Sequence, residues 1–242
     1  MNPPQDNLKR IVMFGAGQDS TGMIIEMINR KMKIDEVIFS DTGTEQPETY
    51  EFIKEFKPYL KKHKIKFTIV KSHLGSLYDY YYKQKSMPFR LYRHCTDKFK
   101  IVPIRKYLQK KYKGKEYIRL FGIACDEKQR ADKIRLYNKD VEFPLLNFKF
   151  DRKDCIETIR KAGLSIPVRS GCYVCPFQSK RVWRELLIKH PKLFDKARKL
   201  EENAKCFPEF VLAQEPLSKI EKWKKQTRLF EDARCVYCEV IK

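Results

Sequence analysis

The stretch Arg10-Ile-Val-Met-Phe-Gly-Ala-Gly-Gln-Asp-Ser-Thr21 decides the fold that we expect for this chain. It opens with an unbroken apolar run of strand length and continues with a turn of small residues at positions 15–17. Residues 21–31 then have the apolar periodicity of an amphipathic helix, with Met23 and Met27 on one face. A buried strand, a tight turn and a helix are the first part of a βαβ unit.

The same alternation continues through the first half of the chain. The sequence predicts strands at residues 10–14, 36–40, 66–70 and 117–121, and helices at residues 21–31, 47–57 and 101–111. Strands that alternate with helices indicate a parallel sheet, and right-handed crossovers place the loops after the strands at one edge. We therefore expect an α/β fold that binds a ligand at this edge.

The composition changes after about Pro144. Residues 1–150 are predicted to form the α/β domain, and residues 151–242 a helical C-terminal region that packs on it and carries two C-x-x-C pairs. Helical patterns in this region cover residues 152–162, 180–200 and 218–228. No internal repeat or low-complexity linker separates the two parts.

The charge of the chain is strongly positive. Its 52 Lys and Arg residues against 31 Asp and Glu residues give a net charge of +21 over 242 residues. Such an excess speeds the capture of polyanions, so tRNA, DNA or another acidic partner is expected. A lysine-rich proteome is the alternative explanation. Without a signal-peptide pattern or a run of about 18 apolar residues, we expect a cytoplasmic protein that has no membrane partner.

Eight cysteines are many for a reducing compartment, where metal ligation or catalysis is a better explanation than disulfides. Four of them form two C-x-x-C pairs, Cys172 with Cys175 and Cys235 with Cys238. Those four thiols would make a tetrahedral structural zinc site. The cysteines without a partner at ligand spacing are predicted to be buried thiols, namely Cys125, Cys155 and Cys206.

The turn after the first predicted strand has the features of a phosphate cradle. Gly15, Ala16 and Gly17 let backbone N–H groups approach an anion, and the helix N-terminus adds partial positive charge. Ser20 and Thr21 offer hydroxyl donors. The Gly-Lys-Ser/Thr of a Walker loop is missing. A turn that serves packing alone is the alternative.

Polar residues also follow two other predicted strands. Asp41, in the turn that ends at Gly43, could accept ribose hydroxyls or hold a metal such as Mg²⁺; its alternative role is to cap the next helix. The segment from Gly122 to Arg130 presents acidic and basic residues together. Arg130 could clamp a phosphate in bidentate fashion, or belong to an ion-paired helix start.

The run Arg90-Leu-Tyr-Arg-His-Cys-Thr-Asp-Lys-Phe-Lys100 surrounds Cys95 with cations. A cysteine among cations has a lowered pKa, and this favours either reactivity or metal ligation. A solvated charged loop is the alternative. An aromatic cluster precedes the run, and its rings could stack unpaired bases or form a half-buried helix face: Tyr78, Tyr80, Tyr81, Tyr82, Phe89 and Tyr92.

Five segments, in this order, resemble one protein family. Residues 15–21 are similar to the PP-loop of adenine nucleotide alpha hydrolases, Ser-Gly-Gly-x-Asp-Ser, with Gly15 in place of Ser and Ala16 in place of Gly. The other four resemble segments of phosphoadenosine phosphosulfate (PAPS) reductases: residues 41–50, 95–103, 122–130 and 143–146. The resemblance extends from Lys9 to about Glu201.

The resemblance implies a parallel-sheet PP-loop fold that holds an adenine nucleotide, either ATP or PAPS and adenylyl sulfate. The residues implied in nucleotide binding are Gly15, Ala16, Gly17, Ser20, Thr21, Asp41, Gly43, Lys100 and Gly122. Those implied in catalysis are Asp19, Ser20, Cys95 and Arg130.

The chain lacks the C-terminal Glu-Cys-Gly-x-His of true PAPS reductases and is more similar to the PAPS reductase-like proteins of phages and DNA-modification operons. Its cysteines also resemble those of PP-loop tRNA thiolases, which implies a [4Fe–4S] cluster on Cys95, Cys172 and Cys175 with one iron free for sulfide. Cys235 or Cys238 could supply a fourth ligand and close the site, and Cys238 is the one we expect. ATP-dependent, adenylating transfer of sulfur or another group to a nucleic acid is the expected function. The alternatives are reduction of PAPS or adenylyl sulfate, and a non-catalytic nucleotide- or nucleic-acid-binding protein with structural zinc.

Overall fold

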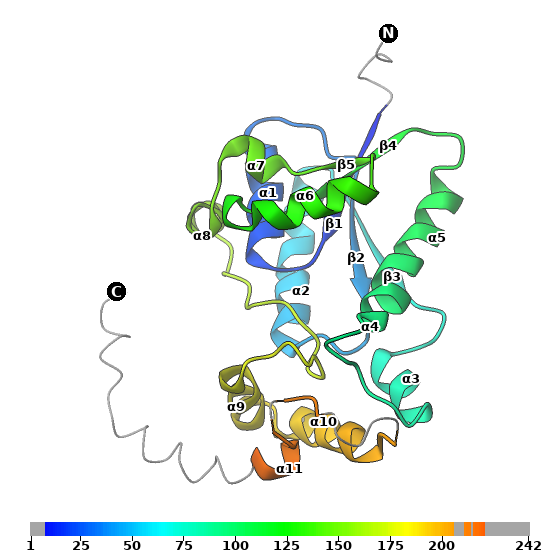
Figure 1. The fold of residues 1–242 in the computed structure, drawn as a ribbon. Coiled ribbons are helices and arrows are strands. Elements are labelled where there is room, and N and C mark those ends of the chain that lie inside the picture. Colours follow the sequence, from blue (N-terminus) through cyan, green and yellow to red (C-terminus); the bar gives the residue numbers. More distant parts are fainter. Residues whose placement is uncertain (1–7, 206–210, 214, 221–242) are drawn as a thin grey trace, which may run out of the picture. The chain divides into compact units, whose positions relative to one another are not determined.

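A computed structural model describes residues 8–205, 211–213 and 215–220 of the chain. Its centre is a five-stranded parallel sheet with the strand order β3-β2-β1-β4-β5 (Figure 1). The strands are β1 (Lys9–Phe14), β2 (Glu36–Asp41), β3 (Lys66–Lys71), β4 (Tyr117–Phe121) and β5 (Val141–Glu142). The predicted α/β fold with a parallel sheet is confirmed.

Helices connect the strands and continue after them. They are α1 (Gln18–Asn29), α2 (Pro47–Lys62), α3 (Leu77–Lys83), α4 (His94–Thr96), α5 (Val102–Lys111), α6 (Lys128–Tyr137), α7 (Pro144–Phe148), α8 (Arg152–Lys161), α9 (Lys180–Lys189), α10 (Pro191–Asn203) and α11 (Leu217–Ile220). A π-helical turn (Asp97–Ile101) precedes α5, and a 3₁₀ turn (Cys125–Glu127) precedes α6. No helix among the described residues is both long and apolar enough to cross a membrane.

The helix predicted at residues 180–200 is in fact two helices. Pro191 is the first residue of α10, and His190 before it has φ −134° and ψ 62°. Proline cannot donate an N–H to a preceding turn and pushes the residue before it out of the helical region, so α9 ends there. Of the helix predicted at residues 218–228, residues 218–220 belong to α11 and the rest lies outside the described residues.

The chain divides into two compact units. The first contains Met1–Ser76 and Cys95–Cys172, and the second contains Leu77–His94 and Tyr173–Lys242. The boundary expected at residue 150 therefore does not coincide with the boundary between the units. Helix α8 belongs to the first unit because Gly22 allows it to approach α1 closely: a Cβ on Gly22 would lie 2.6 Å from the Cβ of Cys155.

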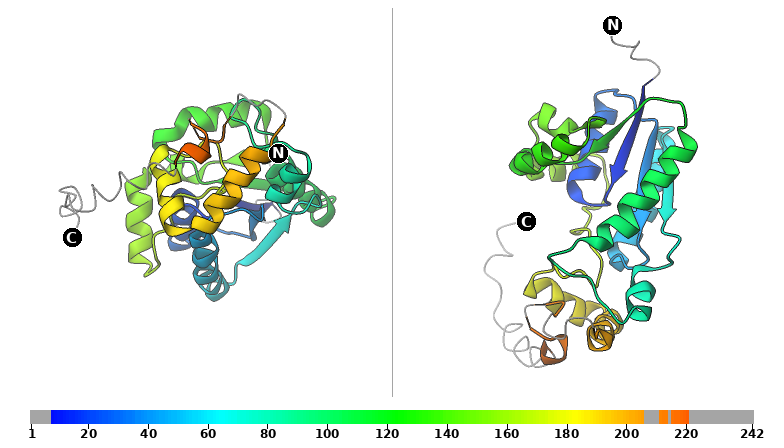
Figure 2. Two further views of the ribbon diagram at one scale, coloured as in Figure 1. Left: turned by 90° about the horizontal axis from the view of Figure 1, so that it is seen from below. Right: turned by 45° about the vertical axis from the view of Figure 1, so that its right-hand side comes forward.

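Successive side chains of a strand point to opposite faces of the sheet, and both faces are buried here. Val12 and Phe14 of β1 belong to a cluster with residues of α1, α2 and α8. Ile11 and Ile38 pack with Leu108 of α5 on the other face. The ribbon of α5 lies along that face of the sheet (Figure 2). The first unit therefore has helices on both faces of its sheet, and the loops after the strands meet at the carboxyl edge.

A buried carboxylate ties three elements together at the opposite end of the sheet. Glu36, the first residue of β2, is fully buried and accepts hydrogen bonds from Thr68 of β3, from two residues of α5 and from the residue that caps the C-terminus of α5. The last three donors are Tyr107 Oη at 2.7 Å, Lys111 Nζ at 2.6 Å and Tyr112 Oη at 2.7 Å. Burial alone would raise the pKa of Glu36, but the bonds from Lys111, Thr68 and the two tyrosines hold it below its ordinary value.

We predict that Glu36→Gln lowers the free energy of unfolding at pH 7 by about 3–5 kcal/mol, because it removes the charge that four donors surround. A carboxyl whose folded pKa is depressed stabilises the fold above its unfolded pKa. That contribution is lost as the pH falls through the folded value. The difference between wild type and variant should therefore shrink below about pH 4.5. Urea unfolding between pH 7 and pH 3 measures this.

The control is Glu51→Gln, which removes an exposed carboxylate paired with Lys54 and should change stability by no more than about 0.5 kcal/mol. A loss in the Glu36 variant that is equally large at every pH would contradict the electrostatic explanation.

Candidate functional site

Residues 15–17 link β1 to α1 at the carboxyl edge of the sheet. Ala16 is fully buried and has φ +54°, a left-handed conformation that costs an alanine roughly 1–2 kcal/mol relative to glycine. Gly17 is the N-cap of α1, and a Cβ on it would lie 3.1 Å from Ser170 Oγ. The turn therefore brings backbone close to the N-terminus of α1, where the partial positive charge of the helix favours an anion.

Two hydroxyl groups that the sequence assigned to this turn face back onto it. Ser20 Oγ donates to the Gly17 carbonyl at 3.2 Å, and Thr21 Oγ1 donates to the same oxygen at 2.8 Å. Both residues are buried. In this structure the hydroxyls close the first turn of α1.

The loop after β4 lies directly on the same helix end. A Cβ on Gly122 would be 2.5 Å from the Cα of Ser20 and 2.7 Å from its backbone nitrogen. Strands β1 and β4 are neighbours, although the strands between them in the sequence lie on the far side of β1. This is the switch point of the sheet, where open α/β proteins bind their ligands. Gly122 shapes the switch point through close packing on α1.

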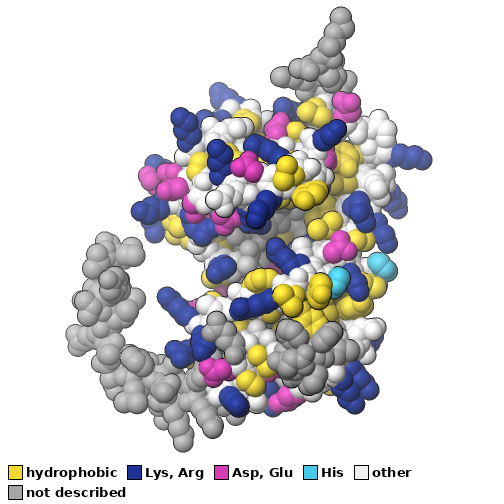
Figure 3. Space-filling view, in the orientation of Figure 1, with side chains coloured by type: hydrophobic (Ala, Val, Ile, Leu, Met, Phe, Trp, Pro, Cys, Tyr) yellow, Lys and Arg dark blue, Asp and Glu magenta, His cyan; other side chains and the backbone are white. Residues whose placement is uncertain are grey.

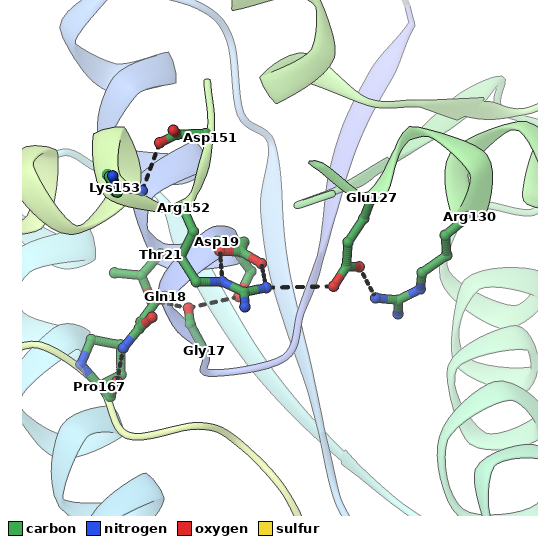
Figure 4. A network of polar contacts seen from close by, with 11 residues as sticks. Gly17, Gln18, Asp19, Thr21, Glu127, Arg130, Asp151, Arg152, Lys153 and Pro167 are labelled. Atoms are coloured by element: carbon green, nitrogen blue, oxygen red, sulfur yellow. Dashed lines mark hydrogen bonds and ion pairs between the residues drawn. The ribbon is translucent and has the colours of Figure 1, made fainter. Parts of the chain in front are cut away.

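A chain of ion pairs runs across the switch point (Figure 4). Arg152 bonds both oxygens of Asp19, at 3.2 Å through Nε and 3.0 Å through Nη2, and its Nη2 also lies 3.4 Å from Glu127 Oε1. Arg130 Nη1 donates to the other oxygen of Glu127 at 2.6 Å. The bond from Arg130 holds the pKa of Glu127 below its ordinary value, and the bond to Asp19 raises the pKa of Arg152. We call Asp19, Arg152, Glu127 and Arg130 the switch-point network.

Arg152 is a residue that sequence reasoning missed, since it lies 133 positions from Asp19. It is the first residue of α8, and the helix start is held by a capping box. Asp151 accepts from the backbone nitrogens of Lys153 and Asp154, and Asp154 accepts from the backbone nitrogen of Asp151. The Asp-x-x-Asp spacing at residues 151–154 was the available signal, because it marks a helix N-terminus.

Asp41 lies at the end of β2, next to β1 in the sheet. Its Oδ1 accepts from the Gly43 backbone nitrogen at 2.9 Å and from Tyr50 Oη at 2.8 Å, while Lys71 lies 3.4 Å from Oδ2. Gly43 has φ +72°, which suits glycine in this turn. Burial and the bond to Asp41 raise the pKa of Tyr50. Asp41 is thus held in one orientation at the carboxyl edge.

A buried polar cluster lies beyond this turn. Glu45, only 3% exposed, accepts from Thr42 Oγ1 at 2.9 Å and from Cys172 Sγ at 3.7 Å, and Lys100 Nζ lies 3.3 Å from it. Burial raises the pKa of the Cys172 thiol to about 12, and the negative charge of Glu45 adds to this increase. Lys100 and Cys172, which the sequence assigned to a nucleotide and to a metal, thus meet at the same carboxylate.

The other predicted metal ligands are placed as follows. Cys95 is partly exposed in the first unit, and Cys175 belongs to the second unit. Cys238, like Cys206 and Cys235, lies outside the described residues. Within the part of the chain that the structure describes, no three His, Cys, Asp or Glu side chains are grouped so as to hold a metal ion. The cluster and the zinc site stay predictions.

The remaining thiols differ from each other. Cys155 is fully buried, as predicted, and burial raises its pKa to about 12. Cys125 is partly exposed, contrary to the prediction. It is the first residue of the 3₁₀ turn before α6, where its Sγ lies 3.8 Å from the Leu145 carbonyl oxygen. A loop at the sheet edge cannot enclose it as a helix interface does.

Residues 9–167 match the phosphoadenosine phosphosulfate reductase domain family. The chain belongs to this family. The matched segment begins with β1 and contains the cradle, Asp41 and the whole switch-point network. Helices α9, α10 and α11 of this PAPS reductase domain protein follow the matched segment.

Two curated proteins of Methanocaldococcus jannaschii are similar to the chain. The uncharacterised protein MJ0973 is 28% identical over 198 residues, and the uncharacterised protein MJ0066 is 24% identical over 208 residues. These alignments cover 76% and 79% of the chain but only 45% and 41% of the relatives, so the chain spans less than half of their length.

Among solved structures, the chain is similar to the U34-tRNA thiolase NcsA from Methanococcus maripaludis, determined with its [4Fe-4S] cluster. The identity is 15%, the TM-score is 0.41, and the match covers 82% of this chain and 74% of the thiolase.

We predict that Gly122→Ala destabilises the protein by about 1–3 kcal/mol, because its Cβ would lie within 3 Å of backbone atoms of Ser20 that cannot move aside cheaply. Urea unfolding measures the change. Gly171→Ala is the control, since a Cβ there meets no atom within 4 Å. Equal stability of the two variants would contradict close packing at the switch point.

Proposed function

We propose that this PAPS reductase domain binds an adenine nucleotide at the switch point and uses ATP to activate an acceptor by adenylation. One observation carries the proposal: Arg152 lies at the N-terminal end of α1, where it pairs with Asp19, and Glu127 links it to Arg130. Helix N-terminus, small-residue turn and guanidinium groups are each suited to phosphate, and here they belong to one sheet edge.

Each part of the site then has a role. The turn at residues 15–17 and the end of α1 would cradle the phosphates. Asp41, at the end of the neighbouring strand, would accept a ribose hydroxyl. In adenylation the acceptor attacks the α-phosphorus and the bond to pyrophosphate breaks. Arg152 and Arg130 would stabilise the charge that develops on the leaving group, and Asp19 and Glu127 keep both arginines oriented beforehand.

Family membership supports a second candidate, reduction of PAPS or adenylyl sulfate at the same site. The nucleotide would occupy the same cradle, and the sulfate would meet the arginines in place of the outer phosphates. The two candidates differ in the nucleotide that binds and in the need for a reductant.

We predict that Arg152→Gln weakens ATP binding about 10- to 100-fold, because charge-assisted hydrogen bonds to the phosphates are lost. Calorimetry with ATP, PAPS and adenylyl sulfate measures the affinities and separates the two candidates. Arg160→Gln, a change at an exposed position of the same helix, should leave them unchanged. Equal ATP affinity in both variants would place the nucleotide elsewhere.

We further propose which molecule is adenylated and which group it then receives. The net charge of +21 supports a nucleic acid, tRNA or DNA, as the acceptor. The spacing of the cysteines supports sulfur transfer with a [4Fe–4S] cluster on Cys95, Cys172 and Cys175, and with Cys238 as the fourth ligand. Ligation would require Cys172 to exchange its hydrogen bond with Glu45 for the metal. Three thiolates would leave one iron open for sulfide, and Cys238 would close that position where it serves as the fourth ligand.

We predict that Cys95→Ser, purified without oxygen, loses its iron, because a hydroxyl replaces a thiolate ligand. Metal analysis per folded chain measures this. The control is Cys155→Ser, since Cys155 packs inside the first unit against Gly22 and has no room for a metal. If Cys95→Ser keeps its metal and a Cys235→Ser/Cys238→Ser variant loses zinc, the metal is structural and the cluster proposal is wrong.

A further inference from the structure

One surface of the second unit combines exposed rings with arginines. Residues 90–94 are all exposed, and Leu91 and Tyr92 keep 72% and 61% of their surface. Phe177, from a distant part of the sequence, is 47% exposed. Large apolar side chains at such exposure need an explanation when they lie together.

Contacts between the two segments bring arginines of residues 90–94 against the ring of Phe177. The guanidinium carbons of Arg90 and Arg93 are 6.0 Å and 5.5 Å from the centre of the Phe177 ring. Arg90 Nε donates to the carbonyl oxygen of Pro176 at 2.7 Å, which anchors the loop beside the ring. We call Arg90, Leu91, Tyr92, Arg93, His94 and Phe177 the arginine–aromatic surface.

Two rings of this surface, those of Tyr92 and His94, are nearly parallel. Tyr92 stacks on His94 with 5.7 Å between ring centres and 15° between planes. Because Tyr92 is so exposed, most of its ring remains accessible for stacking on another planar group. The stretch from Arg90 to Lys100 has Asp97 as its one acidic residue against four Lys and Arg residues, so the partner should be anionic as well as planar.

We propose that the arginine–aromatic surface binds single-stranded nucleic acid, with unpaired bases stacked on Tyr92 and Phe177 and phosphates held by Arg90 and Arg93. Aromatic rings interleaved with arginines are the means by which proteins hold unpaired bases without reading their sequence. A duplex keeps its bases stacked on each other and offers no free face to Tyr92. The inference rests on the proposed function only in that both invoke a nucleic acid.

If positive charge alone determined binding, a polyanion would also bind at positively charged surfaces other than the arginine–aromatic surface. Lysine and arginine side chains are distributed over the face in view in Figure 3. Lys57, Lys61, Lys64 and Lys66 line an open hollow between α2 and β3 in the first unit. The arginine–aromatic surface differs from this hollow in its exposed, stacked rings, and this difference decides the choice of variants.

The test measures fluorescence anisotropy of a labelled oligouridine and a labelled oligothymidine at low salt, without nucleotide. Tyr92→Ala and Phe177→Ala should each weaken binding about tenfold, as expected for the loss of one stacked base. Tyr92→Trp should restore it. The matched control is Tyr137→Ala, which removes a tyrosine that is 86% exposed on α6 of the first unit. A hairpin duplex of the same length should compete poorly.

Three results would overturn the proposal: no binding of any single strand to the wild type, equal affinity of Tyr92→Ala and Tyr137→Ala, or tighter binding of the duplex. Weakening by Lys61→Gln and Lys64→Gln alone would place the polyanion in the lysine hollow. Arg152→Gln separates this proposal from the previous one, because it should lose ATP affinity and retain oligonucleotide affinity.

Discussion

Helix α1 is packed on its neighbours through two positions that have no side chain, and the candidate site depends on this close approach. Gly22 lets α8 lie directly against α1, and the absence of a side chain at Gly122 lets the loop after β4 lie against the backbone of Ser20. As a result, Arg152 at the start of α8 reaches Asp19 in the first turn of α1, and Glu127 after β4 reaches Arg152. A methyl group at either glycine would separate elements that the ion pairs must join.

Carboxylates are the organising groups of the first unit, although the chain is strongly basic. Glu36 joins β2, β3 and α5 at one end of the sheet. Asp19 and Glu127 orient arginines at the other end, and Glu45 gathers Lys100 and Cys172. Each acid has several donors, and a buried or half-buried charge is stable only when its lone pairs are satisfied in this way.

The two units offer different chemistry. The first holds a cradle, a pair of oriented arginines and a fixed aspartate, which together suit the phosphates and ribose of a nucleotide. The second exposes rings and arginines, which suit bases and phosphates of a strand. Cys95 follows the exposed segment of the second unit in the sequence, and Cys172 precedes the other segment.

The sequence by itself determined the parallel sheet, because the strands β1 to β4 are uninterrupted runs of strand length whose ends are marked by small or polar residues. It also placed the cradle and Asp41 at the carboxyl edge, since parallel strands have one such edge. The break at His190 is also a local matter, because Pro191 ends α9. The two-residue β5, the passage of α8 into the first unit and the partners of Lys100 were decided by the tertiary structure. So was the role of Arg152, which depends on how closely α8 approaches α1. Periodicity reports which face of an element is buried, whereas these contacts depend on which distant element covers that face and on how closely two backbones approach.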